Sequence, residues 1–148
     1  MSLQDQITEQ LKVAMKAKDT VALESLRAIK SAILLAQTQA GAKDLNSDDE
    51  IKLVQKLVKQ RKDSAEIFRQ QGRVDLAEPE EAQIKIIEQF LPEQLDEDAI
   101  AAQIDIIITK TGAAGMKDMG KVMGMASKEM AGKADGKTIS SIVRQKLS

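Results

Sequence analysis

The chain has 148 residues, of which 43% are hydrophobic and 30% are charged, and this balance is typical of a folded globular protein rather than a disordered one. Its formal net charge of −1 at pH 7 points to no particular class of partner. The only aromatic residues are Phe68 and Phe90, so the core must consist of Leu, Ile, Val, Ala and Met. Because strands favour aromatic and β-branched residues, this composition favours packed helices over a sandwich or a barrel.

The sequence contains no His, Cys, Tyr or Trp. Without Cys there is no disulfide and no thiolate nucleophile, and without His the commonest general base is missing. A zinc site would have to rely on carboxylates alone, which is unusual. We therefore expect no metal and no cofactor. The serines that remain as candidate nucleophiles could act only with a Lys brought close through space, and they are Ser64, Ser127, Ser140 and Ser141.

No apolar run approaches the roughly 20 residues that are needed to span a bilayer. The first ten residues lack the basic start and the apolar core of a signal peptide. We therefore expect a soluble, cytoplasmic protein with no membrane partner.

Apolar residues at helical spacing predict four helices in the first two thirds of the chain, over about residues 2–18, 20–40, 47–71 and 75–91. Asp19 or Thr20 is expected to cap the second helix, and Asp75 the fourth. Residues 47–50 (SDDE) have the capping-box pattern, in which a Ser hydroxyl and a Glu carboxylate accept from free N–H groups at a helix start. The third helix is therefore expected to begin with Ser47 as its cap.

Pro92 is the strongest boundary signal, because Pro disfavours a helical conformation of the residue before it. We place the domain boundary there, with an N-terminal helical domain over 1–93 and a C-terminal three-helix domain over 94–148. The three C-terminal helices are expected over about residues 97–111, 115–131 and 136–147. Asp96 and Asp135 are the expected caps of the first and the last. Residues 106–109 (IIIT) have strand propensity, but the surrounding period is helical, so we predict helix there.

Gly120 and Gly124 lie four residues apart and therefore share one face of the predicted helix over 115–131. Gly costs roughly 1 kcal/mol against Ala inside a helix, so two on one face need a reason. We favour close packing of a neighbouring helix. The alternative is close approach of a ligand to bare helix backbone.

Gly136, Lys137 and Thr138 look like the end of a phosphate-binding loop. That motif needs four residues between its first Gly and its Gly-Lys pair, whereas Gly132 and Gly136 have three between them. The preceding segment is also predicted to be helical rather than a strand. We interpret Gly136 as part of a tight turn that leaves the backbone open to close approach.

The same predicted helix carries Met116, Met119, Met123 and Met130, mostly three, four or seven residues apart. Core filling is the favoured interpretation, because Met adapts to irregular gaps. The alternative is a docking surface for a partner helix, which would expose an apolar groove that includes Met125 or Met130.

The last forty residues are basic, with eight basic residues against the acidic Asp118, Glu129 and Asp135. The basic residues are Lys110, Lys117, Lys121, Lys128, Lys133, Lys137, Arg144 and Lys146. This asymmetry is compatible with a phosphate-backbone partner. The region has no aromatic residue to stack on bases, so it favours recognition of the phosphates and shape of a folded RNA.

A secondary basic cluster consists of Lys59, Arg61 and Lys62 on the predicted third helix. Asp63 and Glu66 flank it, so part of its charge is expected to be paired locally. A solvated helix face is the favoured interpretation of this cluster.

Several motifs spread over essentially the whole chain resemble the YqeY family. They are residues 59–64 (KQRKDS), 72–73 (GR), 75–77 (DLA), 90–95 (FLPEQL), 116–123 (MKDMGKVM), Gly132, and 134–137 (ADGK). Together they are specific, although no single one would be.

The second half of this family is similar to the C-terminal tail of GatB, a component of the glutamine-dependent amidotransferases that correct Glu-tRNA and Asp-tRNA. In that enzyme the tail is a helical module that reaches the tRNA. The resemblance therefore implies an all-α fold and a link to tRNA. It does not imply the amidotransferase reaction, because the ATP- and metal-binding cradle of GatB and the Ser-Ser-Lys apparatus of the amidase have no counterpart in this sequence. A carbon–nitrogen ligase activity with glutamine as amido donor would belong to the complete amidotransferase.

We expect a non-catalytic accessory protein that binds tRNA. Its phosphate-binding residues would be Lys117, Lys121, Lys137 and Arg144, and its close-approach glycines Gly120, Gly124 and Gly136. The alternative is a helical interaction module that docks on an amidotransferase or another translation protein. A stand-alone enzyme ranks third and would need a pocket with convergent polar groups and a shifted pKa.

Overall fold

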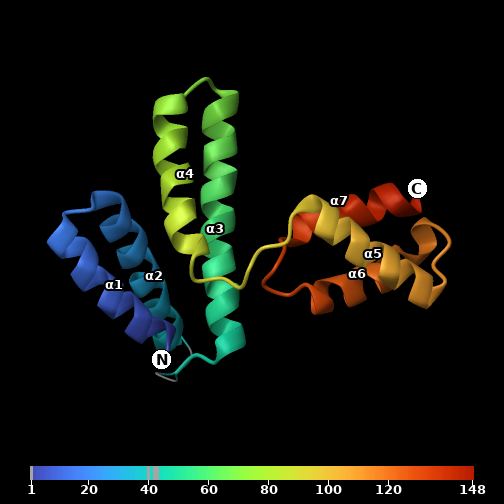
Figure 1. The fold of residues 1–148 in the computed structure, drawn as a ribbon, viewed down its shortest axis with the longest axis horizontal. Coiled ribbons are helices and arrows are strands. Elements are labelled where there is room, and N and C mark those ends of the chain that lie inside the picture. The colour runs from blue at the N-terminus through green and yellow to red at the C-terminus, as the bar shows by residue number, and fades with distance from the viewer. Residues whose placement is uncertain (1, 40, 42–43) are drawn as a thin grey trace. The chain divides into compact units, whose positions relative to one another are not determined.

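The computed structural model describes residues 2–39, 41 and 44–148. The chain divides into two compact units, Met1–Leu91 (unit 1) and Pro92–Ser148 (unit 2). The expected boundary after residue 93 lies two residues beyond this division. Every regular element among the described residues is a helix, so the expected all-α fold is confirmed (Figure 1).

Unit 1 consists of two helical hairpins. The first pairs α1 (Leu3–Ala17) with α2 (Thr20–Gln39), and the second pairs α3 (Ser47–Gln70) with α4 (Val74–Glu88) (Figure 1). Residue 40, where the second helix was expected to end, lies outside the described residues. The two hairpins meet because α2 packs on both α3 and α4. Their shared core consists of aliphatic side chains spaced three, four or seven apart along each helix, among them Ile7, Ile29, Val54 and Ile87.

The caps of unit 1 differ in two places from those expected. Asp19 accepts from the N–H of Ala22 at 3.1 Å, which confirms it as the cap of α2. The cap of α3, however, is Asn46, whose side-chain oxygen accepts from the N–H of Asp49 at 2.8 Å, so the prediction of Ser47 was wrong. Asn is as good a cap as Ser, and this register leaves Glu50 free to accept from the N–H of Leu3 at 3.1 Å, at the start of α1.

The expected cap of α4 was also wrong. Arg73, not Asp75, occupies the cap position, and its side chain makes no capping hydrogen bond. The carboxylate of Asp75 lies in the first turn and instead accepts from Nε and an Nη atom of Arg73, at 3.1 and 3.0 Å. A carboxylate in the first turn still favours the helix through its interaction with the partial positive charge of the helix N-terminus.

Unit 2 consists of α5 (Glu97–Thr111), the 3₁₀ turn η1 (Met116–Asp118), α6 (Met119–Glu129) and α7 (Gly136–Leu147). The expected caps are confirmed: Asp96 accepts from the N–H of Ala99 and Asp135 from the N–H of Thr138, both at 2.8 Å. Residues 106–108 lie within α5, so their strand propensity is overridden. The predicted helix over 115–131 is shorter than expected, because it begins as the 3₁₀ turn and α6 ends at Glu129.

The core of unit 2 lies between its three α-helices. It consists of eleven buried residues, which include Ile104, Ile107, Val122 and Val143. Met130 is buried in this core, and Met119 and Met123 pack against it, so the interpretation of the methionines as core filling is confirmed for these three. Met116 remains exposed. The alternative interpretation, an exposed groove with Met125 or Met130, is not supported, because Met125 also packs on the core and Met130 is buried in it.

Candidate nucleic-acid interface

One side of α6 belongs to the core, and the other carries Gly and Lys. Val122 and Ala126 are fully buried four residues apart. The opposite, exposed side carries four residues, each of which lies three or four positions from another of the set: Gly120, Lys121, Gly124 and Lys128. The apolar period of this helix therefore directs its bare backbone and its ammonium groups to the surface.

The two glycines are not required for packing inside the protein. A Cβ atom built at Gly120 or Gly124 meets no atom of a neighbouring element within 4 Å. Neither residue has a positive φ. Close packing of a neighbouring helix, which the sequence favoured as their explanation, is therefore wrong. Gly136, the first residue of α7, likewise has open space where a Cβ would lie.

The remaining basic residues of the expected site lie on the elements next to α6. Lys117 is exposed in η1, and η1 packs against both α6 and α7. Lys137 and Arg144 are exposed and seven residues apart on α7, on the side opposite the buried Ile139 and Val143. Their spacing places them on one face of α7.

Most of the basic residues of unit 2 are free of internal ion pairs. Within Pro92–Ser148, where every residue is described, the one ion pair joins Lys146 Nζ to Asp105 Oδ1 at 2.9 Å. The basic side chains without an ion pair in the described chain are Lys110, Lys117, Lys121, Lys128, Lys133, Lys137 and Arg144. Their charge is therefore available to an external anion.

Two acidic residues next to this surface, Asp118 and Asp135, are hydrogen-bonded close to their own positions in the chain. Asp118 Oδ2 accepts from the N–H of Ala114 at 2.9 Å, and Asp135 accepts from both the N–H and the hydroxyl of Thr138. Both carboxylates are half-buried. They neutralise none of the lysines through a direct contact, although their charge lowers the local positive potential.

The structure does not bring Lys59, Arg61 and Lys62 together as one basic surface. Arg61 is half-buried, and its Nε donates to Gln83 Oε1 at 2.9 Å while an Nη atom donates to the carbonyl of Leu57. Lys62 Nζ pairs with Glu88 at 3.5 Å. Of the three, Lys59 is exposed and has no partner among the described residues. The sequence had no signal for the Arg61–Gln83 contact, because the two residues lie on different helices.

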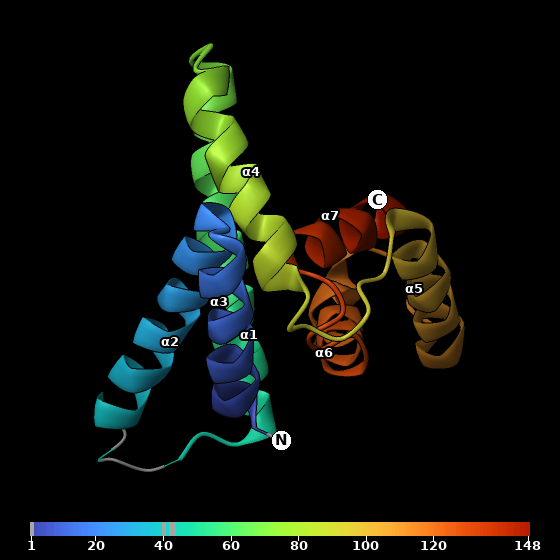
Figure 2. The same ribbon diagram turned by 60° about the vertical axis from the view of Figure 1, so that its left-hand side comes forward.

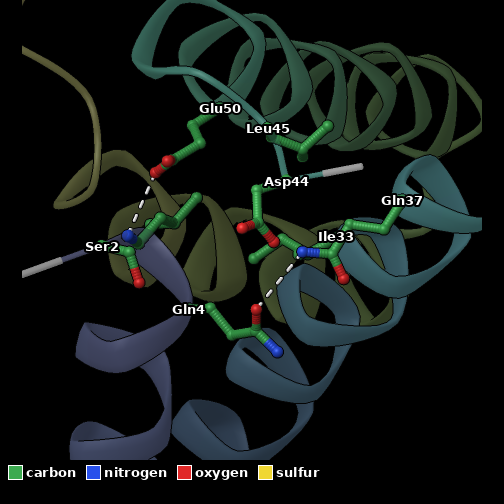
Figure 3. Close-up of a pocket in the computed structure, with 8 residues that line it drawn as sticks. Ser2, Gln4, Ile33, Gln37, Asp44, Leu45 and Glu50 are labelled. Carbon is green, nitrogen blue, oxygen red and sulfur yellow. Dashed lines mark hydrogen bonds between the residues drawn. The ribbon is translucent and has the colours of Figure 1, made fainter. Parts of the chain in front are cut away.

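A cavity of about 180 Å³ lies in unit 1 where α1, α2 and the start of α3 meet (Figure 3). Polar groups that line it include Gln4, Gln37, Asp44 and Glu50. The amide of Gln37 donates to Gln4 Oε1 at 3.4 Å, and the carboxylate of Glu50 accepts from the N–H of Leu3 in α1. Ligand sites in proteins are usually about 300 Å³ or larger, so this cavity is small for an organic substrate.

The shifted pKa values of unit 1 belong to exposed structural contacts. The hydrogen bond from Arg69 lowers the pKa of Glu81, and that from Arg73 lowers the pKa of Asp75. The hydrogen bonds with Ser2 in the capping box of α1 lower the pKa of Asp5. None of these groups forms the convergent set that a catalytic pocket requires.

Two further kinds of site find no support in the described part of the chain. No group of three or more acidic residues is placed to hold a metal ion. The segment before Gly136 is helix α6 and a turn, not the strand that a nucleotide-binding loop follows.

No helix among the described residues is long and apolar enough to cross a membrane.

Comparison with known proteins finds a matching family and several relatives. The family model described as "Yqey-like protein" matches residues 4–147. The protein "Altered inheritance of mitochondria protein 41, mitochondrial" of Lachancea thermotolerans is 40% identical over 85 residues, which are 57% of this chain and 46% of that protein. The protein of the same name from Pyrenophora tritici-repentis is 32% identical over 131 residues, 84% of this chain and 68% of that one. The chain thus spans about half the length of the first of these relatives.

A more distant relative is named as an amidotransferase subunit. A glutamyl-tRNA(Gln) amidotransferase subunit from Thermococcus gammatolerans is 30% identical over 105 residues, which are 68% of this chain but only 17% of that larger protein. The shared part is thus a small portion of the enzyme. Because the family model covers nearly every residue, the chain belongs to the YqeY family.

Proposed function

We propose that this chain is an accessory protein that binds tRNA through the exposed face of η1 and α6 and the adjoining face of α7, and that it catalyses no reaction of its own. The observation that carries the proposal is the combination of unpaired lysines with exposed glycines on α6. Gly in a helix lowers stability, and here no internal contact compensates for it. A partner that approaches the bare backbone would supply the compensation.

The charge and the shape of this surface suit a phosphate backbone. Lys121 and Lys128 lie on the same exposed side of α6 as the two glycines, and Lys117, Lys137 and Arg144 lie on the adjacent elements. Unpaired cations of this kind bind phosphates and release counterions. The surface has no aromatic side chain, so shape and phosphate contacts rather than base stacking would govern recognition.

The similarity to a protein of a glutamyl-tRNA(Gln) amidotransferase supports tRNA as the nucleic acid. The region shared with that protein is a small part of it, which supports a role in binding rather than in the amide-forming reaction. The cytoplasmic location expected from the sequence stays a prediction, and the fungal relatives carry the word mitochondrial in their names.

The test is binding of the full chain to total tRNA at two salt concentrations. Each phosphate contact should contribute about −0.7 to −0.9 to the slope of log affinity against log salt concentration. A variant with Lys117→Glu, Lys121→Glu and Lys137→Glu should lose most of the binding and have a flatter slope. A matched variant with Lys12→Glu, Lys16→Glu and Lys30→Glu makes the same change in net charge on exposed positions of unit 1 and should bind tRNA nearly as well as the parent. Equal losses in both variants, or no binding at low salt, would rule the proposal out.

A second candidate function, docking on an amidotransferase or another translation protein, is favoured by a different observation. Unit 1 exposes several large apolar side chains on α3 and α4. If the chain does not bind tRNA in the test above, docking through this surface becomes the leading candidate function.

A further inference from the structure

The hairpin of α3 and α4 extends beyond the pair formed by α1 and α2, as both views show (Figures 1 and 2). Near the start of α2, the side chain of Gln83 on α4 contacts this helix, because Gln83 Nε2 donates to Glu24 Oε2 at 3.1 Å. Arg61 bonds to the same Gln83 from α3. Residues 63–82, which we call the distal hairpin, lie beyond these polar contacts.

The distal hairpin has small residues inside and large apolar residues outside. Ala65 and Ala77 are 5% and 0% exposed, and they close the seam between the two helices. By contrast, Ile67 is 52% exposed and Leu76 is 38% exposed, and Phe68 is half-buried. None of these three large side chains belongs to the core of unit 1. Burial of such side chains against a partner would be favourable, because it removes apolar surface from water.

The three large side chains continue helix faces that are covered nearer to the core. On α3, Phe68 follows Leu57 by eleven residues and Ile67 follows Leu53 by fourteen, which are close to three and four helical turns. Both Leu53 and Leu57 pack against the core of unit 1.

On α4, Leu76 precedes the buried Ile87 by eleven residues. Phe68 and Leu76 therefore lie on the side of the hairpin that α2 covers nearer to the core, and Ile67, the neighbour of Phe68 on α3, lies at the edge of that side. We call these three residues the distal face. Helix α2 does not extend as far as the distal face, so unit 1 leaves that face uncovered.

The charges around the distal face are acidic. The distal hairpin has six acidic residues and two basic ones. Both basic residues are held internally, because Arg69 bonds to Glu81 and Arg73 to Asp75.

Glu80 lies on the distal face itself, four residues after Leu76 and three before Gln83. It is half-buried and has no ion pair in the described chain. An unpaired carboxylate next to exposed apolar side chains suits a partner that brings a cation.

The charge decides between the possible occupants of this face. A second copy of the chain, docked through the same face, would place Glu80 and the other acids of one hairpin against those of the other, which is repulsive. An anionic lipid surface would be repelled for the same reason. We propose that the distal face is a docking site for an amphipathic helix of another protein, whose apolar side is bordered by Lys or Arg. This inference is independent of the tRNA proposal, which concerns unit 2.

The probe for this site is a helical peptide of about 14 residues made only of Leu and Lys, with Leu on one side. It is titrated into the full chain while the backbone amide resonances are followed by NMR. The expected result is a set of shifts that group on residues 63–82. Leu76→Glu should weaken the binding about tenfold or more, because it places a charge in the centre of the apolar contact. Leu35→Glu, at an exposed leucine of α2, is the matched control and should leave the affinity unchanged.

Reversing the charge of Glu80 distinguishes docking at the distal face from a general attraction of the basic peptide to an acidic protein. Glu80→Lys should reduce affinity for the Leu/Lys peptide and raise it for a peptide in which every Lys is replaced by Glu. Circular dichroism checks that each variant stays folded. Shifts that fall outside residues 63–82, or an unchanged affinity of Leu76→Glu, would overturn the proposal. Hairpin resonances that move with the concentration of the free chain would overturn it in favour of a second copy as the occupant.

Discussion

The guanidinium of Arg61 on α3 donates to the amide oxygen of Gln83 on α4, and the amide nitrogen of Gln83 in turn donates to Glu24 on α2. Three helices are thus joined by one chain of hydrogen bonds at the edge of the core of unit 1. Arg61 also donates to the carbonyl of Leu57, one turn earlier on its own helix. A residue that looks in the sequence like part of a basic surface therefore positions Gln83, and Gln83 links the two hairpins through Glu24.

Replacement of Arg61 should lower stability rather than tRNA binding. Arg61→Ala removes hydrogen bonds to Gln83 and to backbone, and we expect the free energy of unfolding to fall by about 1–2 kcal/mol. Lys59→Ala, at an exposed position two residues earlier, should change it by less than about 0.5 kcal/mol. Chemical denaturation of both variants measures this difference. Equal stabilities, or a loss of tRNA affinity specific to Arg61→Ala, would contradict the structural role.

The start of α3 offers a test at single-residue resolution. Asn46→Ala removes the side-chain oxygen that accepts from the N–H of Asp49, so we expect a loss of about 1 kcal/mol in unfolding free energy. Ser47→Ala changes the first residue of the helix, which makes no capping hydrogen bond, and should be nearly neutral. If Ser47→Ala proved the more damaging substitution, the capping box expected from the sequence would be the correct register.

The sequence was sufficient for the helices because their signals are local. The caps of α5 and α7 and the apolar period of each helix depend on residues within a few positions of one another. One error arose where two capping residues, Asn46 and Ser47, stand side by side, and the other where the carboxylate of Asp75 binds the side chain of Arg73 instead of capping the helix. The polar contacts of Gln83 and the open space around Gly120 depend on residues far apart in the chain, so no pattern in the sequence predicted them.

At the candidate site, too, local patterns were predictable from the sequence and contacts between helices were not. Helical spacing by itself places Lys117, Lys121 and Lys128 near one side of their predicted helix. It could not separate Arg61 from the basic residues beside it, because the difference lies in what the neighbouring helix presents. It also could not decide why the glycines are there, since that depends on what surrounds them.

Acid should remove the contribution of the ion pair between Arg69 and Glu81. The hydrogen bond from Arg69 lowers the pKa of Glu81 below its ordinary value of 4.5. A carboxyl group whose pKa is lower in the folded state stabilises the fold above its unfolded pKa, and this contribution is lost as the pH falls through the folded pKa. The contribution is small, because the pair is exposed to solvent.

The measurement compares the parent with Glu81→Gln by chemical denaturation at about pH 7 and at about pH 2. The parent should be the more stable at neutral pH, and the difference should shrink as the pH falls through the pKa that Glu81 has in the folded state. Glu66→Gln, at an exposed carboxylate without an ion pair in the described chain, is the control for the loss of one negative charge from the same hairpin. A difference that grows in acid would show that the pair does not lower the pKa of Glu81.

The glycines of α6 give opposite expectations for stability and for binding. Gly120→Ala and Gly124→Ala each add a methyl group that meets no neighbouring element, at positions without a positive φ. Each should therefore raise the free energy of unfolding by about 0.5–1 kcal/mol, because Ala loses less conformational entropy in a helix than Gly does. If a tRNA backbone approaches this face closely, the same methyl groups should weaken its binding.

The control for the two glycine variants is Gly112→Ala at the end of α5. Gly112 has a φ of 67° and open space around it, so Ala there should destabilise the fold without touching the proposed interface. Denaturation and tRNA titration of the three variants separate the outcomes. Variants at Gly120 and Gly124 that are more stable and bind tRNA as tightly as the parent would show that the glycines serve neither the fold nor the proposed contact.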